Sequence, residues 1–238
     1  MTKKITTLCC TVAMLATTAA TPALSQSKNF AGPSIAISGN LNHGQIKITE
    51  RANDETAGGL NETSSFKLGN DSTTFSIDLS QTFALDNKFA LGIGAGYDFG
   101  KIKLGQTNYS ESTGPTTSTL NLELKDHYNI YLQPMYIMSD NSSIFGKVGY
   151  NFAKGTLKAT LDDASGSASK NFEGWNYGIG AKFLIDKNLF IQTEANYTVY
   201  DSVKADLTSS FSDTYGDEYS LTFKPEVLSA KISIGYKF

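Results

Sequence analysis

The chain ends on a strict alternation of apolar with polar or small residues that continues to the carboxylate. The apolar positions are Ile232, Ile234, Tyr236 and Phe238, and Lys231, Ser233, Gly235 and Lys237 lie between them. Successive side chains of a β-strand point to opposite faces, so this pattern predicts a strand with one apolar face. Soluble domains rarely end on an aromatic residue, because chain ends fray and meet water. The last strand therefore needs an apolar environment on one side.

The same period of two recurs upstream. The segments are 35–41, 75–85, 89–99, 120–136, 144–152, 175–185 and 189–199, followed by the last strand over 226–238. In a soluble sandwich the apolar faces would form the core. Here the polar faces consist of Gly, Ser, Asn and isolated charges, which suits a narrow lumen with lipid on the outside.

Aromatic residues mark both ends of the apolar faces. One level carries a predicted girdle of Tyr97, Phe99, Tyr128, Tyr150, Trp175, Tyr177 and Tyr197, and the other carries Phe89, Tyr136, Phe183, Tyr236 and Phe238. Their separation fits one strand crossing of a bilayer, about 9–11 residues. Paired girdles of this kind are typical of transmembrane β-barrels.

Short and long connections alternate along the chain. The short turns are 86–88, 139–142 and 186–188, and the long polar connections are 51–70, 101–119, 154–173 and 201–224. This order predicts an all-β fold, an eight-stranded antiparallel transmembrane up-and-down β-barrel with short periplasmic turns and four long extracellular loops. Both termini would then be periplasmic. Closure removes the strand edges that would leave unpaired backbone groups in lipid.

The alternation changes phase outside these crossings. Ile46 and Ile48 are out of step with Leu41, and similar changes occur near 100 and near 225. Gly44, Gly100 and Pro225 lie at the changes and predict β-bulges near the outer rim. Several strands are expected to extend above the membrane as hairpins.

The first residues predict a secretory signal peptide. Lys3 and Lys4 precede an apolar and small-residue stretch that is too short to span a bilayer, and 23–25 fits a cleavage site. We expect a cleaved signal over 1–25 and a β-barrel domain over 26–238. Both cysteines of the chain fall in the signal, so the mature barrel would hold neither a disulfide nor a thiolate metal site.

The motifs resemble those of a known group. The chain is similar to the small outer-membrane β-barrel family that includes the OmpA/OmpX-type and opacity-type porin-like proteins. The resemblance rests on the signal, the strands, the run 92–97 (GIGAGY), the run 147–150 (KVGY) and the end 233–238 (SIGYKF). It implies a Gram-negative outer membrane with its lipid and lipopolysaccharide as surroundings. It also implies that periplasmic chaperones and the barrel-assembly machinery handle the chain, with Ile234, Tyr236 and Phe238 as the assembly signal.

Composition and spacing argue against several other functions. The formal net charge is −3 and Arg51 is the only arginine, which disfavours nucleic-acid binding. The glycines of 92–96 lack the spacing and the following helix of a dinucleotide site. His127 faces inward and lacks a serine two residues later, so the spacing of the lipid A deacylases is missing. We therefore predict no catalytic, cofactor-binding or metal residues.

Five charged residues should project into the lumen. They are Asp78, Lys147, Lys182, Glu194 and Lys231. Unpaired charges in a narrow barrel are costly, so one interpretation is a plug of ion pairs, with Glu194 near Lys231 on a neighbouring strand. The other interpretation is a polar path for a small solute. Eight strands leave an interior only just wide enough for side chains, which favours the plug.

The sequence supports three hypotheses on function. The leading one is a non-enzymatic outer-membrane barrel whose surface loops serve membrane integrity or bind an extracellular or host-surface ligand, as an adhesin does. The second is a small porin-like channel. The third is a lipid-modifying barrel enzyme, which the missing His-x-Ser pair disfavours.

Overall fold

The chain forms one closed antiparallel β-barrel. The computed structural model describes residues 26–53, 61–110, 117–161, 164–206 and 218–238. The elements are the 3₁₀ turn η1 (Ser27–Asn29) and the strands β1 (Gly32–Asn53), β2 (Asn61–Ala84), β3 (Phe89–Phe99), β4 (Ile102–Ser110), β5 (Thr117–Ile137), β6 (Ser142–Leu161), β7 (Ala164–Leu184), β8 (Leu189–Tyr200), β9 (Val203–Asp206) and β10 (Glu218–Lys237). Among these residues, no helix is both long and apolar enough to cross a membrane.

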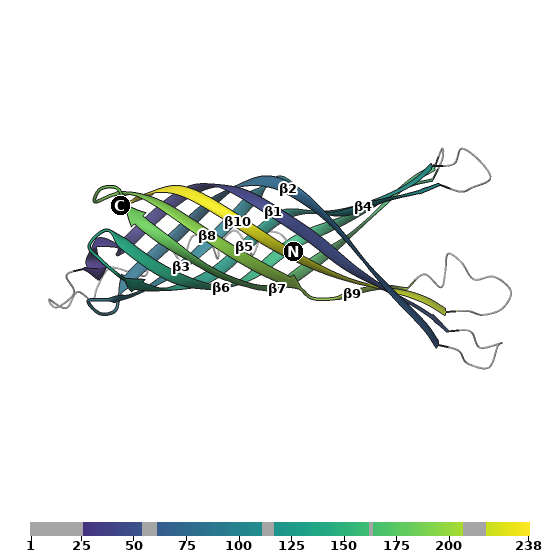
Figure 1. The fold of residues 1–238 in the computed structure, drawn as a ribbon, viewed down its shortest axis with the longest axis horizontal. Helices are drawn as coiled ribbons and strands as arrows, with labels where there is room; N and C mark the ends of the chain where they lie inside the picture. Colours follow the sequence, from purple (N-terminus) through teal and green to yellow (C-terminus); the bar gives the residue numbers. More distant parts are fainter. Residues whose placement is uncertain (1–25, 54–60, 111–116, 162–163, 207–217) are drawn as a thin grey trace, which may run out of the picture.

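The ten strands trace eight paths around the barrel. Both β3 and β4 pair with β5, and both β8 and β9 pair with β10, so each of these pairs is one interrupted path. Pairing of β1 with β10 closes the sheet (Figure 1). The predicted eight-stranded antiparallel barrel is therefore confirmed. The predicted signal, 1–25, lies outside the described residues.

Three tight turns gather at one end of the barrel, which we call the turn end. They connect β2 to β3, β5 to β6 and β7 to β8, and Figure 1 shows the C-terminus at the same end. The last residue is fixed there, because the backbone N–H of Phe238 donates to the carbonyl of Pro33 at 2.9 Å. The opposite end, where the strands run far beyond the barrel body, is the loop end.

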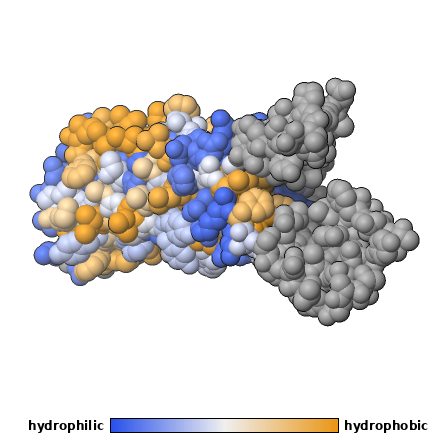
Figure 2. All heavy atoms as spheres, turned by 45° about the vertical axis from the view of Figure 1, so that its right-hand side comes forward, coloured by the Kyte–Doolittle hydropathy of each residue, from blue (hydrophilic) through white to orange (hydrophobic). Residues whose placement is uncertain are grey.

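The period of two sorts apolar residues outward and polar residues inward in the barrel body. On β7, Ile179 is 72% exposed whereas Asn176 is 6% exposed. Figure 2 shows the resulting hydrophobic zone on the outside of the barrel body, with hydrophilic atoms at the turn end and before the loop end. Such a surface suits a lipid environment, because soluble monomers rarely expose extensive contiguous apolar areas.

The predicted long loops are largely strand, which corrects the expected loop boundaries and confirms that several strands extend as hairpins beyond the barrel body. β1 and β2 pair as far as Asn53 with Asn61, and β6 and β7 as far as Leu161 with Ala164. Within these expected loops, 54–60, 111–116, 162–163 and 207–217 lie outside the described residues. In β4, for example, the outward Lys103 is polar, which made the segment resemble a loop, whereas the inward Ile102 and Leu104 are apolar and buried.

The bulges expected at Gly44 and Pro225 are absent, which corrects a second prediction. The register of β1 with β10 runs without a shift past both residues, and Gly44, Ile46 and Ile48 all face inward. The apolar residues change sides because the outer face leaves the lipid, so the strand keeps its phase while its two faces exchange character. Gly44 serves a close approach, since a Cβ there would lie 2.4 Å from the carbonyl oxygen of Lys103 on β4.

The actual irregularities lie in β4 and β5 and beside β3. Gly100, with φ +114°, separates β3 from β4 as expected. β5 carries a register shift against β6 between Lys125 and Tyr128, where Asp126 has φ 54°. A second shift lies between Lys103 and Gly105. The β5 bulge moves inward-facing positions from even to odd numbers and turns His127 into the barrel.

Two apolar clusters occupy the interior at different heights. The loop-end cluster consists of Ile46, Ile48, Ile102, Leu104, Leu122, Leu124, Ala153, Phe172, Tyr200 and Val227. The turn-end cluster consists of Phe30, Ala90, Met135, Ile137, Phe145, Leu184 and Phe190. Phe30 follows η1, so the segment before β1 folds under the barrel and helps to close it.

Candidate functional site: the lumen

The lumen between the two clusters is lined by polar side chains from every strand path. Buried serine, threonine, asparagine and glutamine residues surround the charged groups and bond to one another. For example, Ser38 donates to Ser233 at 2.9 Å across the β1–β10 pair. Buried polar groups need such partners, because an unpaired one costs about 1–3 kcal/mol.

Lys147 and Glu194 form the most enclosed ion pair of the lumen. The Lys147 Nζ lies 2.9 and 2.8 Å from the two carboxylate oxygens, and the side chains are 6% and 2% exposed. Gln192 and Asn196 also donate to this carboxylate, at 3.0 and 2.9 Å. Each carboxylate oxygen of Glu194 therefore accepts two hydrogen bonds, Oε1 from Lys147 and Asn196 and Oε2 from Lys147 and Gln192.

The Lys147–Glu194 pair spans an intervening strand. Lys147 belongs to β6 and Glu194 to β8, with β7 between them. The inward residues of β7 at this level are Gly178 and Gly180, whose hypothetical Cβ atoms would lie 2.3 Å from the Asn196 side chain and 2.4 Å from the Phe145 ring. Glycine on β7 therefore leaves room for Asn196 and Phe145, and β7 presents no side chain between Lys147 and Glu194 at these two positions.

Lys231 joins the two carboxylates on either side of it. Its ammonium binds Asp78, and it lies 3.9 Å from Glu194, its register partner on β8. Asp78 stands on β2, so this ion pair also crosses a strand, β1. Asp78, Lys147, Glu194 and Lys231 are thus brought together in one chain of charges.

Lys182 lies apart from this chain of charges. Its Nζ is placed 4.3 Å from the centre of the Phe190 ring, and the residue is 5% exposed. Within the described residues no ion pair of Lys182 is found. A cation over an aromatic face is stabilised by the ring quadrupole, so Lys182 connects the polar lumen to the turn-end cluster.

His127 is fully enclosed at the loop end of the lumen. The Tyr200 hydroxyl lies 3.3 Å from the Nδ1 of His127, and the Nε2 has no partner in the part of the chain that the structure describes. Neither a serine nor a carboxylate bonds to the ring there. The arrangement lacks the base–nucleophile pair that hydrolytic chemistry requires.

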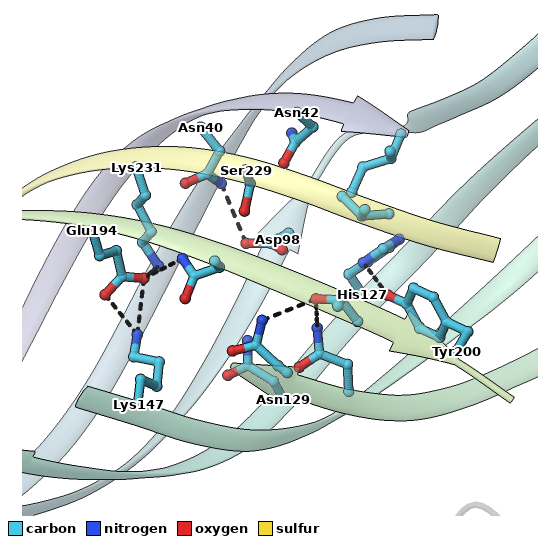
Figure 3. A pocket seen from close by; sticks show the side chains of 16 residues that line it. Asn40, Asn42, Asp98, His127, Asn129, Lys147, Glu194, Tyr200, Ser229 and Lys231 are labelled. Atoms are coloured by element: carbon cyan, nitrogen blue, oxygen red, sulfur yellow. Dashed lines mark hydrogen bonds and ion pairs between the residues drawn. The ribbon is translucent and has the colours of Figure 1, made fainter. Parts of the chain in front are cut away.

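A small cavity lies beside His127. Its volume is about 40 Å³, and Asn40, Asp98, His127, Asn129 and Lys231 are among its lining residues (Figure 3). This volume is enough for about three water molecules. Apolar clusters lie on both sides of it along the barrel axis.

The outward aromatic residues form contiguous rows at the two levels. Tyr150 packs edge-on against Trp175 at 5.3 Å, and Tyr128 stacks on Phe152 at 4.8 Å. At the turn end, Phe89 packs on Tyr136 at 5.4 Å and Tyr236 on Phe238 at 5.2 Å. Their role as interfacial girdles, and that of Ile234, Tyr236 and Phe238 in assembly, stay predictions.

Sequence reasoning missed three parts of this site. It did not identify Asp98 as a lumen charge without a lysine partner, the Tyr200–His127 contact, or the two apolar clusters. The signal for the clusters was present in the change of phase at Ile46 and Ile102, which was interpreted as a bulge. Among the described residues, no group of three His, Cys, Asp or Glu side chains is placed to hold a metal ion.

Comparison with known proteins identifies the family. Residues 10–238 match the family described as outer membrane protein beta-barrel domain. The chain belongs to this family. Membership places it in the bacterial outer membrane. No curated protein matches the chain.

Solved structures of outer-membrane barrels are similar to this chain at low identity. The outer membrane protease OmpT of Escherichia coli is 11% identical with a TM-score of 0.52, covering 86% of this chain and 97% of its own. The attachment invasion locus protein Ail of Yersinia pestis is 16% identical with a TM-score of 0.41, covering 84% and 99%. OprG of Pseudomonas aeruginosa is 11% identical with a TM-score of 0.49, covering 87% and 96%. The similarity to OmpT shows the fold alone.

Proposed function

We propose that this outer-membrane barrel is a closed, non-conducting and non-enzymatic anchor that presents β-sheet at the cell surface to bind an external partner. The observation that carries the proposal is the layered interior. An apolar cluster lies at each end of the lumen, and the charged residues between them hold one another. A solute would have to displace both clusters to pass.

The sheet at the loop end supports the binding part of the proposal. Above the barrel body the strands separate into two groups, which we call blades (Figure 1). One blade consists of the upper parts of β9, β10, β1 and β2, and the other of β4 and the upper parts of β5, β6 and β7. Functional surfaces of such scaffolds reside in the segments that they display.

The upper part of β7 offers an unpaired strand edge. β8 pairs with β7 only from Gly174 downward, while β6 pairs with it as far as Ala164. Within the described residues, 164–172 therefore has a sheet partner on one side only. An exposed edge can accept an extended segment of another protein by main-chain hydrogen bonding. We infer that the partner is a protein with such a segment.

Planar-bilayer recording tests the closed lumen. The refolded mature protein should show no reproducible conductance steps, with folding verified by the heat-dependent gel mobility of β-barrels. Stable unitary steps from a folded barrel would refute closure and support the porin-like alternative. Substitution of Lys147 and Glu194 would then be expected to change the step size.

Cysteine labelling tests the orientation. The chain after residue 25 contains no cysteine, so single substitutions report cleanly. We expect Ser167→Cys, on β7 at the loop end, to react with a membrane-impermeant maleimide on intact cells. The matched control Asp140→Cys, in an exposed turn at the turn end, should react only after lysis. Labelling of the turn on intact cells would contradict the orientation.

Trimmed hairpins test the edge. Joining Thr156 to Ser169 with a two-residue turn removes the top of β6 and β7 without changing the register below. This variant should lose adhesion to host cells or matrix proteins. The control, joining Glu50 to Ser64 in the same way, shortens the other blade and should retain it. Equal adhesion by both variants would exclude the β7 edge.

A further inference from the structure

Three lysines lie side by side on the outer face of β10, β1 and β2. Lys47 of β1 is the register partner of Lys224 on β10 and of Lys67 on β2. Residues directly opposite each other share one face of a sheet, and the strand spacing places their backbones about 5 Å apart. All three side chains are exposed. We call these three residues the lysine row.

The lysine row lacks a counter-charge in the part of the chain that the structure describes. None of its members forms an ion pair there. Two outward carboxylates lie below it, but both have other partners. Glu226 accepts from the Tyr197 hydroxyl at 2.8 Å, and Asp71 lies 2.7 Å from the His43 ring. Like charges directly opposite each other destabilise a sheet, so the row costs stability until an external anion compensates it.

A second register pair of outward lysines, by contrast, has a carboxylate beside it. Lys125 on β5 is the register partner of Lys154 on β6. Glu123 lies two residues before Lys125 on the same face, and it accepts from Lys101 at 2.9 Å. The lack of such a neighbouring carboxylate bond, within the described residues, distinguishes the lysine row.

The lysine row continues the lipid-facing side of the barrel upward. The register of β1 with both neighbours has no shift, so Lys47 lies on the same face as Ile37 and Leu41, which are 62% and 66% exposed. Lys224 stands four residues beyond the outward Leu228 of β10. At about 3.3 Å per residue and a tilt of about 40°, this places Lys224 about 10 Å above the apolar zone. Figure 2 shows hydrophilic atoms between the hydrophobic zone and the loop end.

A row of hydroxyl side chains lies directly above the lysines. Thr49 is the register partner of Thr222 on β10 and of Ser65 on β2, and it follows Lys47 by two residues on the same face. Hydroxyl groups donate to phosphate oxygens and to sugars, and lysine binds phosphate as a point charge. The outer face of these three strands therefore combines positive charge with neutral hydrogen-bond donors.

We propose that the lysine row binds the phosphorylated headgroup of an outer-leaflet glycolipid, lipopolysaccharide, that stands beside the barrel. A lipid of the leaflet reaches this face because its headgroup lies just above the apolar zone, at the level of the row. A polyanion from the medium would instead meet the strand ends at the loop end first. A phosphate group carries up to about two negative charges, so one or two such groups balance the three ammonium groups. The bound lipid holds the blade that contains β10, β1 and β2, which is not the blade with the β7 edge.

Binding of rough lipopolysaccharide to the refolded mature protein tests the proposal. The barrel is refolded in a zwitterionic detergent, and bound lipopolysaccharide is counted by native mass spectrometry during a titration. Combining Lys47→Gln, Lys67→Gln and Lys224→Gln should weaken binding about 100-fold, at about fivefold for each lysine near an anionic lipid surface. The urea midpoint of this variant without lipopolysaccharide should stay equal or rise, because three adjacent like charges have been removed. Unchanged affinity would overturn the proposal.

A matched triple variant controls for the change in net charge. Combining Lys28→Gln, Lys88→Gln and Lys187→Gln removes three exposed lysines at the turn end and should leave the affinity unchanged. Equal weakening by the two triple variants would overturn the site. If the first triple variant does not refold, the single variant Lys47→Gln, with an expected loss of about fivefold, gives the same decision.

Two further ligands identify the group that is bound. Lipopolysaccharide from which the phosphate groups have been removed should bind weakly, and its affinity should no longer depend on the lysine row. Tight, row-dependent binding of this dephosphorylated lipid would overturn the phosphate assignment. Row-dependent binding of soluble dextran sulfate in preference to lipopolysaccharide would overturn the lipid assignment and indicate a polyanion from the medium.

Discussion

Removal of the Glu194 carboxylate should be among the most damaging single changes in the barrel. Its side chain is 2% exposed, and Lys147 donates to both of its oxygens. In Glu194→Ala the Lys147 ammonium stays buried without its counter-charge, and Gln192 and Asn196 lose an acceptor. Breaking one partner of a buried ion pair costs about 3–5 kcal/mol.

Urea unfolding converts this cost into a midpoint. With a slope of about 2 kcal/mol per molar urea, a loss of about 4 kcal/mol lowers the midpoint by about 2 M. The single tryptophan, Trp175, lies on the outer face and reports unfolding by fluorescence as it leaves the lipid. An unchanged midpoint in Glu194→Ala would refute the reasoning that this pair holds the lumen.

A paired variant separates charge from volume. The double variant Lys147→Met with Glu194→Gln removes both charges while keeping similar shapes. Replacing a buried ion pair as a whole by groups of similar volume is often neutral, so the double variant should recover most of the lost stability. The volume-matched single variant Glu194→Gln, which leaves Lys147 charged, should stay destabilised, and full recovery of its midpoint would assign the damage in Glu194→Ala to lost volume alone.

Three further predictions concern positions outside the ion pairs. Gly44→Ala should lower the free energy of unfolding by about 1–3 kcal/mol, because the added Cβ would lie 2.4 Å from the carbonyl oxygen of Lys103 on β4. The control Gly39→Ala should be tolerated, since a Cβ there has no neighbouring atom within 4 Å. Equal urea midpoints for the two variants would contradict the close approach at Gly44. The turn carboxylate of Asp186 accepts hydrogen bonds from the backbone N–H groups of Leu189 and Asn188, each at 2.7 Å, and these bonds lower the pKa of Asp186. The stabilising effect of this carboxylate should therefore be complete above the ordinary pKa range of a carboxyl group and lost as pH falls through the lowered pKa. An NMR titration of Asp186 with an ordinary midpoint would contradict this prediction. Phe238→Ala should reduce the folded barrel recovered from outer membranes while in-vitro refolding persists, and loss of both would point to a structural role instead.

The barrel could be predicted from the sequence because its strongest signal is local. Period-two alternation and polar turns report on neighbouring residues, and the turns at 86–88, 139–142 and 186–188 all occur where expected. The extent of the strands could not be predicted in the same way. Beyond the lipid the apolar side chains face inward and the polar side chains face outward. We assumed from the sequence that apolar residues always face outward, and we therefore predicted bulges at Gly44 and Pro225 where the two faces exchange character.

The site was predictable by residue but not by contact. The alternation of inward and outward positions predicted which charged residues face the lumen. Glu194 was expected to pair with its register neighbour Lys231, but its closest charged partner is Lys147 on β6. That contact depends on Gly178 and Gly180 of the intervening strand and on the small barrel radius. Neither the intervening glycines nor the barrel radius can be deduced from which adjacent strands pair. Asp98 was assigned to the inner face, but its lack of an ion pair is a property of the whole lumen.

The order of the interior layers bears directly on the choice between pore and anchor. Ion pairs alone could rearrange and open a polar path, because a lysine that leaves one carboxylate can find another across the lumen. Such a rearrangement would still meet Phe30, Phe145 and Phe190 at the turn end and Ile46, Leu104 and Leu124 at the loop end. Apolar packing offers a hydrated solute no substitute partners, so opening would require separating β-strands that pair continuously around the barrel. The proposed anchor role therefore depends less on the strength of the ion pairs than on the two apolar clusters that enclose them.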